Sequence, residues 1–105
     1  MRLNRAEYVN AIRDPNAFSA MCEDYRAGAS IDLEHDKSDA ENLIECPTLI
    51  LWGSKSPTTS ALFDVQATWR NEGVNMQFKA VESGHFLPEE NRQETLSALN
   101  AFFRS

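Results

Sequence analysis

A continuous apolar run lies in the middle of the chain, in the segment PTLILWG at residues 47–53. Proline and glycine bound this run, so the strand that it predicts extends over Thr48–Trp52. A strand that is apolar at every position is typical of a parallel sheet, in which helices cover both faces. The run therefore predicts an α/β fold.

The residues after this strand repeat the order of helix and strand. Ser60 can cap a helix that ends near Gly73, and the alternation over Met76–Ala80 predicts a second strand. Pro88, followed by two glutamates, predicts the first turn of a last helix. A strand–helix–strand unit of this length is a parallel crossover. The apolar residues that we expect to be buried on the two helices are Leu62, Val65, Trp69, Leu96, Leu99, Phe102 and Phe103.

The first half of the chain predicts helices. Asp14 as N-cap and Pro15 at the first position begin a helix that ends near Gly28. A shorter helix is expected before it, over Arg5–Ile12. The segment SDAE at 38–41 has the form of a capping box and predicts one or two further helical turns.

Two strands are too few for a free-standing sheet. A strand that is apolar on both faces also needs neighbouring strands at both of its edges. Either a partner chain completes the sheet, or this chain is the C-terminal part of a larger α/β protein, and we favour the second interpretation.

The composition argues against several function classes. Ten Lys and Arg residues against sixteen Asp and Glu residues give a net charge of −6, whereas nucleic acids and anionic membranes attract basic surfaces. No apolar run approaches the roughly 20 residues that span a bilayer, and the N-terminus lacks the apolar stretch of a signal peptide. Cys22 and Cys46 form neither a disulfide framework nor a zinc site, so we expect small core residues and a reducing, cytoplasmic setting. We expect no metal, no nucleic acid and no membrane as partners.

His85 carries the clearest chemical signal. It follows the second predicted strand, in the segment ESGHF at 82–86, and precedes a helix. Ligands of open α/β sheets bind beyond the carboxyl ends of the strands. An imidazole titrates near neutral pH and can act there as a general base, and Gly84 would let the backbone approach a substrate. The alternative is a loop histidine that is hydrogen-bonded for structural reasons alone.

Several segments resemble the α/β-hydrolase family. The segment IECPTLILWG at 44–53 resembles the penultimate strand of the hydrolase sheet, and ESGHFLPEE at 82–90 resembles the catalytic-histidine loop after the last strand. Upstream, MCEDYRAGA at 21–29 and IDLEHD at 31–36 are similar to the haloacetate (fluoroacetate) dehalogenase branch, in which they close the cap domain. The resemblance begins near Glu7. It implies that residues 1–37 end a helical cap domain and that residues 38–105 form the C-terminal part of an α/β-hydrolase core, incomplete on its own.

The resemblance implies a hydrolysis in two steps. An aspartate carboxylate attacks the carbon that bears the halogen of a 2-haloacid and forms an ester, and the histidine matched by His85 activates the water that hydrolyses this ester. Tyr25 matches the cap tyrosine that donates a hydrogen bond to the departing halide. No cofactor is implied. The implied partners are the haloacid and either a second copy of the full-length protein, as a homodimer, or a complementing chain.

The chain departs from the family pattern in two places. Its four glycines never frame a Gly-x-nucleophile-x-Gly turn, so we expect the nucleophile to lie upstream of this segment. The loop SKSPTTS at 54–60 holds no carboxylate, whereas many α/β hydrolases carry the acidic triad residue there. The dehalogenase branch places its acid after the preceding strand. We therefore expect one triad residue here and no activity of this chain alone.

Other polar residues fit simpler roles. Nothing in the sequence activates the serines of loop 54–60, which suit turns and helix caps. His35 lies in a solvated acidic segment without metal-ligand spacing, and Asp64 is expected on a helix surface. Tyr25 has core packing as its alternative role.

Three interpretations of function stay open at this point. The first is a segment of a haloacetate dehalogenase-like hydrolase. The second is another cap-bearing α/β hydrolase, such as an epoxide hydrolase, which uses the same aspartate and histidine chemistry. The third is an inactive truncated product or an interaction module that pairs its open sheet edge with another chain.

Overall fold

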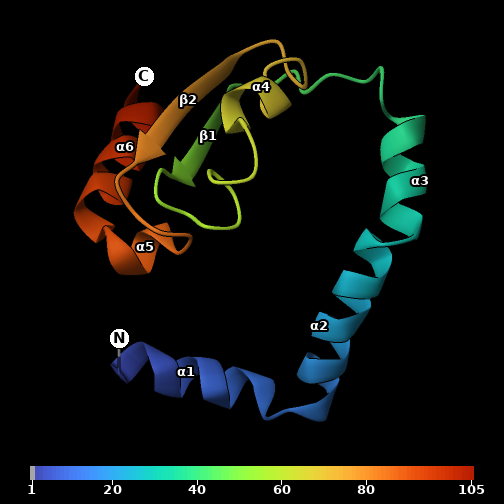
Figure 1. Ribbon diagram of the computed structural model, residues 1–105, viewed down its shortest axis with the longest axis vertical. Helices are drawn as coiled ribbons and strands as arrows, with labels where there is room; N and C mark the ends of the chain where they lie inside the picture. The colour runs from blue at the N-terminus through green and yellow to red at the C-terminus, as the bar shows by residue number, and fades with distance from the viewer. Residues whose placement is uncertain (1) are drawn as a thin grey trace. The chain divides into compact units, whose positions relative to one another are not determined.

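Residues 2–38 form three helices joined by short turns. The computed structural model describes residues 2–105 and divides the chain into two units, Met1–Glu41 and Asn42–Ser105 (Figure 1). The first unit holds α1 (Arg2–Ile12), α2 (Pro15–Gly28) and α3 (Ile31–Ser38). The predicted start of α2 is confirmed, because the Asp14 carboxylate accepts a hydrogen bond from the backbone N–H of Asn16 at 2.9 Å.

Ser38 ends a helix and does not begin one. Its hydroxyl donates to the carbonyl of Glu34 at 3.1 Å, one turn back in α3, and residues 39–41 form a turn. The predicted capping box is therefore wrong. A serine hydroxyl can bond to the backbone behind it as well as ahead of it, and the sequence pattern does not distinguish the two.

The second unit is built on two parallel strands. β1 (Thr48–Gly53) pairs with β2 (Met76–Val81), in register from Thr48 opposite Met76 to Gly53 opposite Val81. Figure 1 shows the two arrows pointing the same way. Both predicted strands and their parallel pairing are confirmed, and each strand is one residue longer than predicted.

The connection between the strands differs from the prediction. Only α4 (Val65–Trp69) is helical, and its N-cap is Asp64, which accepts a hydrogen bond from the N–H of Ala67 at 3.0 Å. Ser60 was expected to cap this helix. Its hydroxyl instead donates to two backbone carbonyls of its own loop, both at 3.0 Å, and so stabilises the turns over residues 54–62.

The chain ends in two helices where one was predicted. α5 (Leu87–Glu90) holds Pro88 in its first turn, as expected, and α6 (Arg92–Arg104) runs beside β2 (Figure 1). Asn91 separates them, because its side chain accepts a hydrogen bond from the N–H of Glu94 at 3.2 Å and caps α6.

Few apolar side chains are fully buried within the described part of the chain. Val65 and Val81 are the buried hydrophobic residues there, and every residue from Thr48 to Trp52 is half-buried. The stripe predicted to be buried on α6 is only partly covered, since Leu99 and Phe102 are half-buried whereas Leu96 and Phe103 are exposed. Cys46 is exposed, which contradicts its expected place in the core, and Cys22 is half-buried. The apolar surfaces of β1 and α6 are thus only partly covered.

None of the helices that the structure describes is long and apolar enough to cross a membrane.

Candidate functional site

The loops that follow β1 and β2 are held against each other. The N–H of Ser54 donates to the carbonyl of Val81 at 2.8 Å, and the N–H of Lys55 donates to the carbonyl of Ser83 at 2.9 Å. The ammonium of Lys55 also forms an exposed ion pair with Glu82 at 3.0 Å. The backbone hydrogen bonding between the two strands therefore continues into the loops that follow them. The loop after β2 contains His85.

Gly53 permits the close approach of these two loops. A Cβ atom at Gly53 would lie 1.9 Å from the carbonyl oxygen of Gly84 and 2.6 Å from that of Ser83. Both neighbours are backbone atoms, which cannot move aside as the end of a side chain can, so glycine is required there. Sequence reasoning used Gly53 only as the boundary of a strand.

The imidazole of His85 faces three hydroxyl groups. Its Nδ1 lies 3.4 Å from the Oγ of Ser56, 3.4 Å from the Oγ1 of Thr59 and 3.5 Å from the Oγ1 of Thr58. The ring of Phe86 packs against it edge to face, with centroids 5.1 Å apart. Each hydroxyl can either donate to Nδ1 or accept a hydrogen bond from Nδ1–H, so these contacts are compatible with both neutral forms of the ring.

Ser56 is the buried member of this hydroxyl cluster, which consists of Ser56, Thr58 and Thr59. It is 1% exposed, and its Oγ accepts a hydrogen bond from the N–H of Thr59 at 3.2 Å. The expected turn role of the loop is correct, but sequence reasoning missed its contact with His85. The available signal was topological, because loops after neighbouring parallel strands meet at one edge of the sheet.

Glu90 stabilises the turn that contains His85. Its Oε2 accepts a hydrogen bond from the N–H of Phe86 at 2.9 Å. A Cβ atom at Gly84 would lie 2.6 Å from one carboxylate oxygen and 2.7 Å from the other. The Glu90 carboxylate therefore occupies the space that a side chain at residue 84 would take, and the approach of a substrate to the Gly84 backbone stays a prediction. Sequence reasoning assigned Glu90 only to the helix N-terminus.

The exposed carboxylate of Glu82 is paired with Lys55. The hydrogen bond from Lys55, together with the positive charge of its ammonium group, lowers the pKa of the Glu82 carboxyl. Glu82, which precedes His85 in sequence, is thus paired with Lys55, and Glu90, which follows it, accepts a hydrogen bond from a backbone N–H.

Tyr25, the second predicted site residue, lies on α2 in the first unit and is 81% exposed. Core packing within that unit therefore does not account for it, and its contact with a halide stays a prediction.

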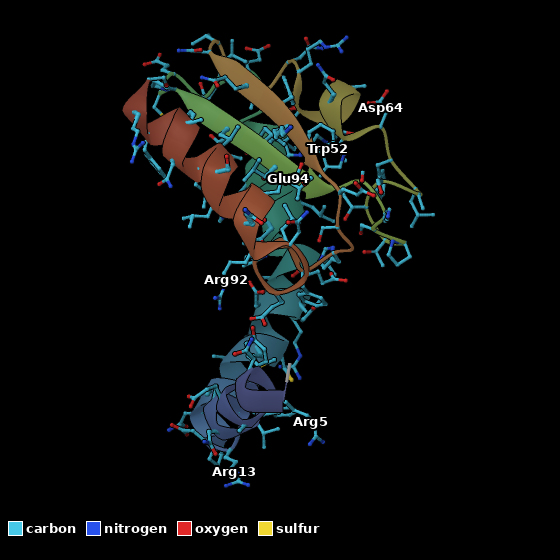
Figure 2. All side chains as sticks on the ribbon, turned by 90° about the vertical axis from the view of Figure 1, so that its left-hand side faces the viewer. Arg5, Arg13, Trp52, Asp64, Arg92 and Glu94 are labelled. Carbon is cyan, nitrogen blue, oxygen red and sulfur yellow. The ribbon has the colours of Figure 1, made fainter. Side chains whose placement is uncertain are left out.

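The remaining candidates have structural explanations. Asp64 caps α4 (Figure 2) and is exposed, as expected. Trp52 is half-buried near the end of β1. His35 is exposed on α3, and the residues that the structure describes include no cluster of three or more side chains suited to a metal ion.

Sequence comparisons place the chain beside two hydrolases. It is 38% identical over 96 residues to a fluoroacetate dehalogenase from Burkholderia sp. and 31% identical over 99 residues to a soluble epoxide hydrolase from Corynebacterium sp. strain C12. The alignments cover 91% and 93% of this chain but 31% and 32% of those proteins. No family model matches the chain.

Structural comparisons agree with this result. A protein from Nostoc sp. PCC 7120, provisionally described as an α/β hydrolase, matches with a TM-score of 0.86 at 45% identity. A protein from Salmonella enterica, provisionally described as an acyltransferase, matches with a TM-score of 0.85 at 36% identity. The matches cover 93% and 94% of this chain and 33% of each of those chains. The chain thus spans about a third of the length of the proteins that it matches.

Proposed function

Because this chain belongs to the α/β-hydrolase family, we propose that it forms the histidine-bearing part of a hydrolase in which His85 is the general base. The observation that carries the proposal is the position of His85. It lies beyond the carboxyl ends of two parallel strands, with Nδ1 facing the hydroxyl cluster, and an imidazole placed there can act as a general base.

The proposed chemical step is the hydrolysis of an ester between substrate and enzyme. Nε2 of His85 takes a proton from water while the water oxygen attacks the ester carbonyl. The bond between the carbonyl carbon and the ester oxygen then breaks, and the leaving oxygen takes the proton from His85 to give the hydroxylated product. The carboxyl group of the enzyme loses its own proton to solvent and is again a carboxylate. That carboxylate belongs to a residue outside this segment.

For the substrate, we propose a 2-haloacid. The chain is more similar to the fluoroacetate dehalogenase than to the epoxide hydrolase, at 38% against 31% identity over similar lengths. Exposed Tyr25 supports the choice, because a phenol O–H is a suitable donor to a departing halide. An epoxide is the second candidate, and its opening releases no halide.

The test uses an intact enzyme that contains this segment, supplied with fluoroacetate and with a small epoxide in separate assays. Wild type should release fluoride. His85→Gln should release one equivalent of fluoride and then stop, with mass spectrometry showing one covalent adduct per enzyme. His35→Gln, which changes the exposed histidine of α3, should behave as wild type.

Two results would contradict parts of this proposal. Unmodified His85→Gln enzyme after one turnover would remove His85 from the hydrolytic step. Turnover of the epoxide without fluoride release from fluoroacetate would leave His85 as the proposed base. It would make an epoxide, and not a haloacid, the substrate.

A further inference from the structure

The backbone of the loop that carries His85 is bound by the start of α6 as well as by the loop after β1. We propose that Asn91 is a positioning residue for His85, because its side-chain amide holds the backbone carbonyl of Glu82, three residues before the histidine. This inference rests on the proposed function of His85.

The backbone carbonyls at the end of β2 have partners on two different elements. Those of Val81 and Ser83 accept hydrogen bonds from the loop after β1, at 2.8 and 2.9 Å. The carbonyl of Glu82, between them, accepts a hydrogen bond from Nδ2 of Asn91 at 3.0 Å. Within the described residues β2 pairs with a strand on one side only, and an edge strand leaves backbone groups without a partner strand. The amide of Asn91 therefore supplies a partner that the sheet does not.

The donor and acceptor roles at Asn91 are unambiguous. Its Oδ1 accepts the N–H of Glu94 at 3.2 Å, and a backbone N–H can only donate. Its Nδ2 donates to the carbonyl of Glu82, which can only accept, and to Oε2 of Glu94 at 2.9 Å. The oxygen of the amide thus caps α6, while its nitrogen holds the loop before His85.

Residues beside the Asn91–Glu82 hydrogen bond are buried on both elements. Ser83, which follows Glu82, is 5% exposed, and Thr95, one turn after Asn91 in α6, is 6% exposed. Asn91 itself is half-buried. A hydrogen bond that is partly shielded from water is stronger than one in full solvent, so this contact is suited to fix the loop.

Glu90 binds the same loop directly after His85. Its Oε2 accepts the N–H of Phe86 at 2.9 Å. In one continuous helix the side chains of residues 90 and 91 would diverge by about 100°. The chain instead breaks between α5 and α6, with φ −147° and ψ 69° at Asn91, and both side chains reach the loop. The backbone on both sides of His85 in sequence is thus held by two consecutive residues.

The test separates the two roles of the Asn91 side chain in an intact enzyme that contains this segment. Asn91→Ser keeps an oxygen that can cap α6 but has no amide to hold Glu82, whereas Asn91→Ala loses both. Both variants should hydrolyse the covalent intermediate about 3- to 10-fold more slowly than wild type, the range expected for one hydrogen bond between neutral groups. Both should form the intermediate at the wild-type rate, because the proposed base acts only in its hydrolysis.

Stability provides the second measurement. Asn91→Ala should unfold at a lower urea concentration than Asn91→Ser, because only the alanine variant lacks the cap. Asn100→Ser, a change at an exposed asparagine of the same helix, should alter neither rate nor stability. The rates come from single turnovers of fluoroacetate or of a small epoxide, whichever the enzyme accepts. The amplitude reports the folded fraction and the rate constant reports the placement of His85.

Three outcomes would overturn the inference, and they separate it from the proposed function. Wild-type hydrolysis by Asn91→Ser, while His85→Gln stalls at the intermediate, would leave Asn91 as a helix cap alone and His85 as the base. Equal slowing of formation and hydrolysis would show a general loss of structure. Normal hydrolysis of the intermediate by His85→Gln would contradict the proposed function, and this inference would fail with it.

Discussion

Gly53 and Gly84 lie against each other at the ends of the two strands, yet a side chain would meet different neighbours at each. At Gly53 it would meet the backbone oxygens of Ser83 and Gly84, whereas at Gly84 it would meet the carboxylate of Glu90. A carboxylate at the end of a flexible side chain can move aside, but the backbone of the loop that carries His85 cannot do so without displacing the turn.

Gly53→Ala should therefore destabilise the protein more than Gly84→Ala. Forcing a methyl group into occupied space costs about 1–3 kcal/mol, and at Gly53 the strain also displaces the His85 turn. Urea denaturation of both variants measures the difference, and Gly28→Ala, where a Cβ meets nothing within 4 Å, is the control. Equal stabilities of the Gly53 and Gly84 variants would contradict the predicted difference.

Tyr25→Phe should slow carbon–halogen cleavage and leave stability almost unchanged. A hydrogen bond to a charged partner is worth about 1.5–3 kcal/mol, which corresponds to roughly a 10- to 150-fold slower step. The ring is 81% exposed, so the stability change should stay below about 1 kcal/mol. Single-turnover cleavage of fluoroacetate and bromoacetate should show the larger effect for fluoride, the poorer leaving group.

Tyr8→Phe serves as the matched control for this measurement, since Tyr8 is an exposed tyrosine on α1. Equal, small effects of Tyr25→Phe on both substrates would remove Tyr25 from the site.

At the scale of the structural elements, the loops after β1 and β2 are bound to each other. The Lys55–Glu82 ion pair and two backbone hydrogen bonds join them at residues that precede His85 in sequence. Both side chains of the ion pair are exposed, so its contribution to stability is small.

Lys55→Met should raise the pKa of Glu82 back toward its ordinary value. Since Lys55 lowers that pKa, the pair contributes stability above the ordinary carboxyl pKa and loses it as the pH falls through the lowered one. A carbon-detected NMR titration of the Glu82 carboxyl measures the change. Lys79→Met, which alters a lysine 3.9 Å from Glu94, should leave Glu82 unchanged. Identical titrations of Glu82 in wild type and Lys55→Met would contradict the assignment.

At the scale of the whole molecule, the chain carries the proposed base, His85, and no nucleophile elbow. We predict that it does not turn over haloacids by itself, because a general base alone contributes only about 10²–10⁴-fold to a rate. Purified chain is incubated with fluoroacetate or chloroacetate, and released halide is compared with a heat-killed control. Halide release that His85→Ala abolishes would show that the chain is a catalyst by itself.

A sheet of two strands leaves much of the apolar surface of this chain uncovered. β1 is apolar throughout but only half-buried, and Leu62 and Phe103 are exposed at 69% and 76%. The incomplete cover of β1 agrees with the sequence, because a strand apolar on both faces requires more sheet than two strands provide, whereas Leu62 and Phe103 were expected to be buried and are not.

The sequence by itself determined the strands, the parallel pairing and the starts of α2 and α5. These follow from local chemistry: an apolar run between Pro47 and Gly53, an N-cap at Asp14 and a first-turn proline at Pro88. It also placed His85 at a strand end.

Tertiary structure alone decided the partners of His85 and the roles of the serines. Ser38 and Ser60 were expected to begin helices, and both bond to backbone carbonyls instead. A hydroxyl can donate to whichever carbonyl the fold brings near, so the residue type does not determine its partner. Ser56 lies 29 residues from His85 in sequence, and only the register of β1 against β2 brings the two loops to one place.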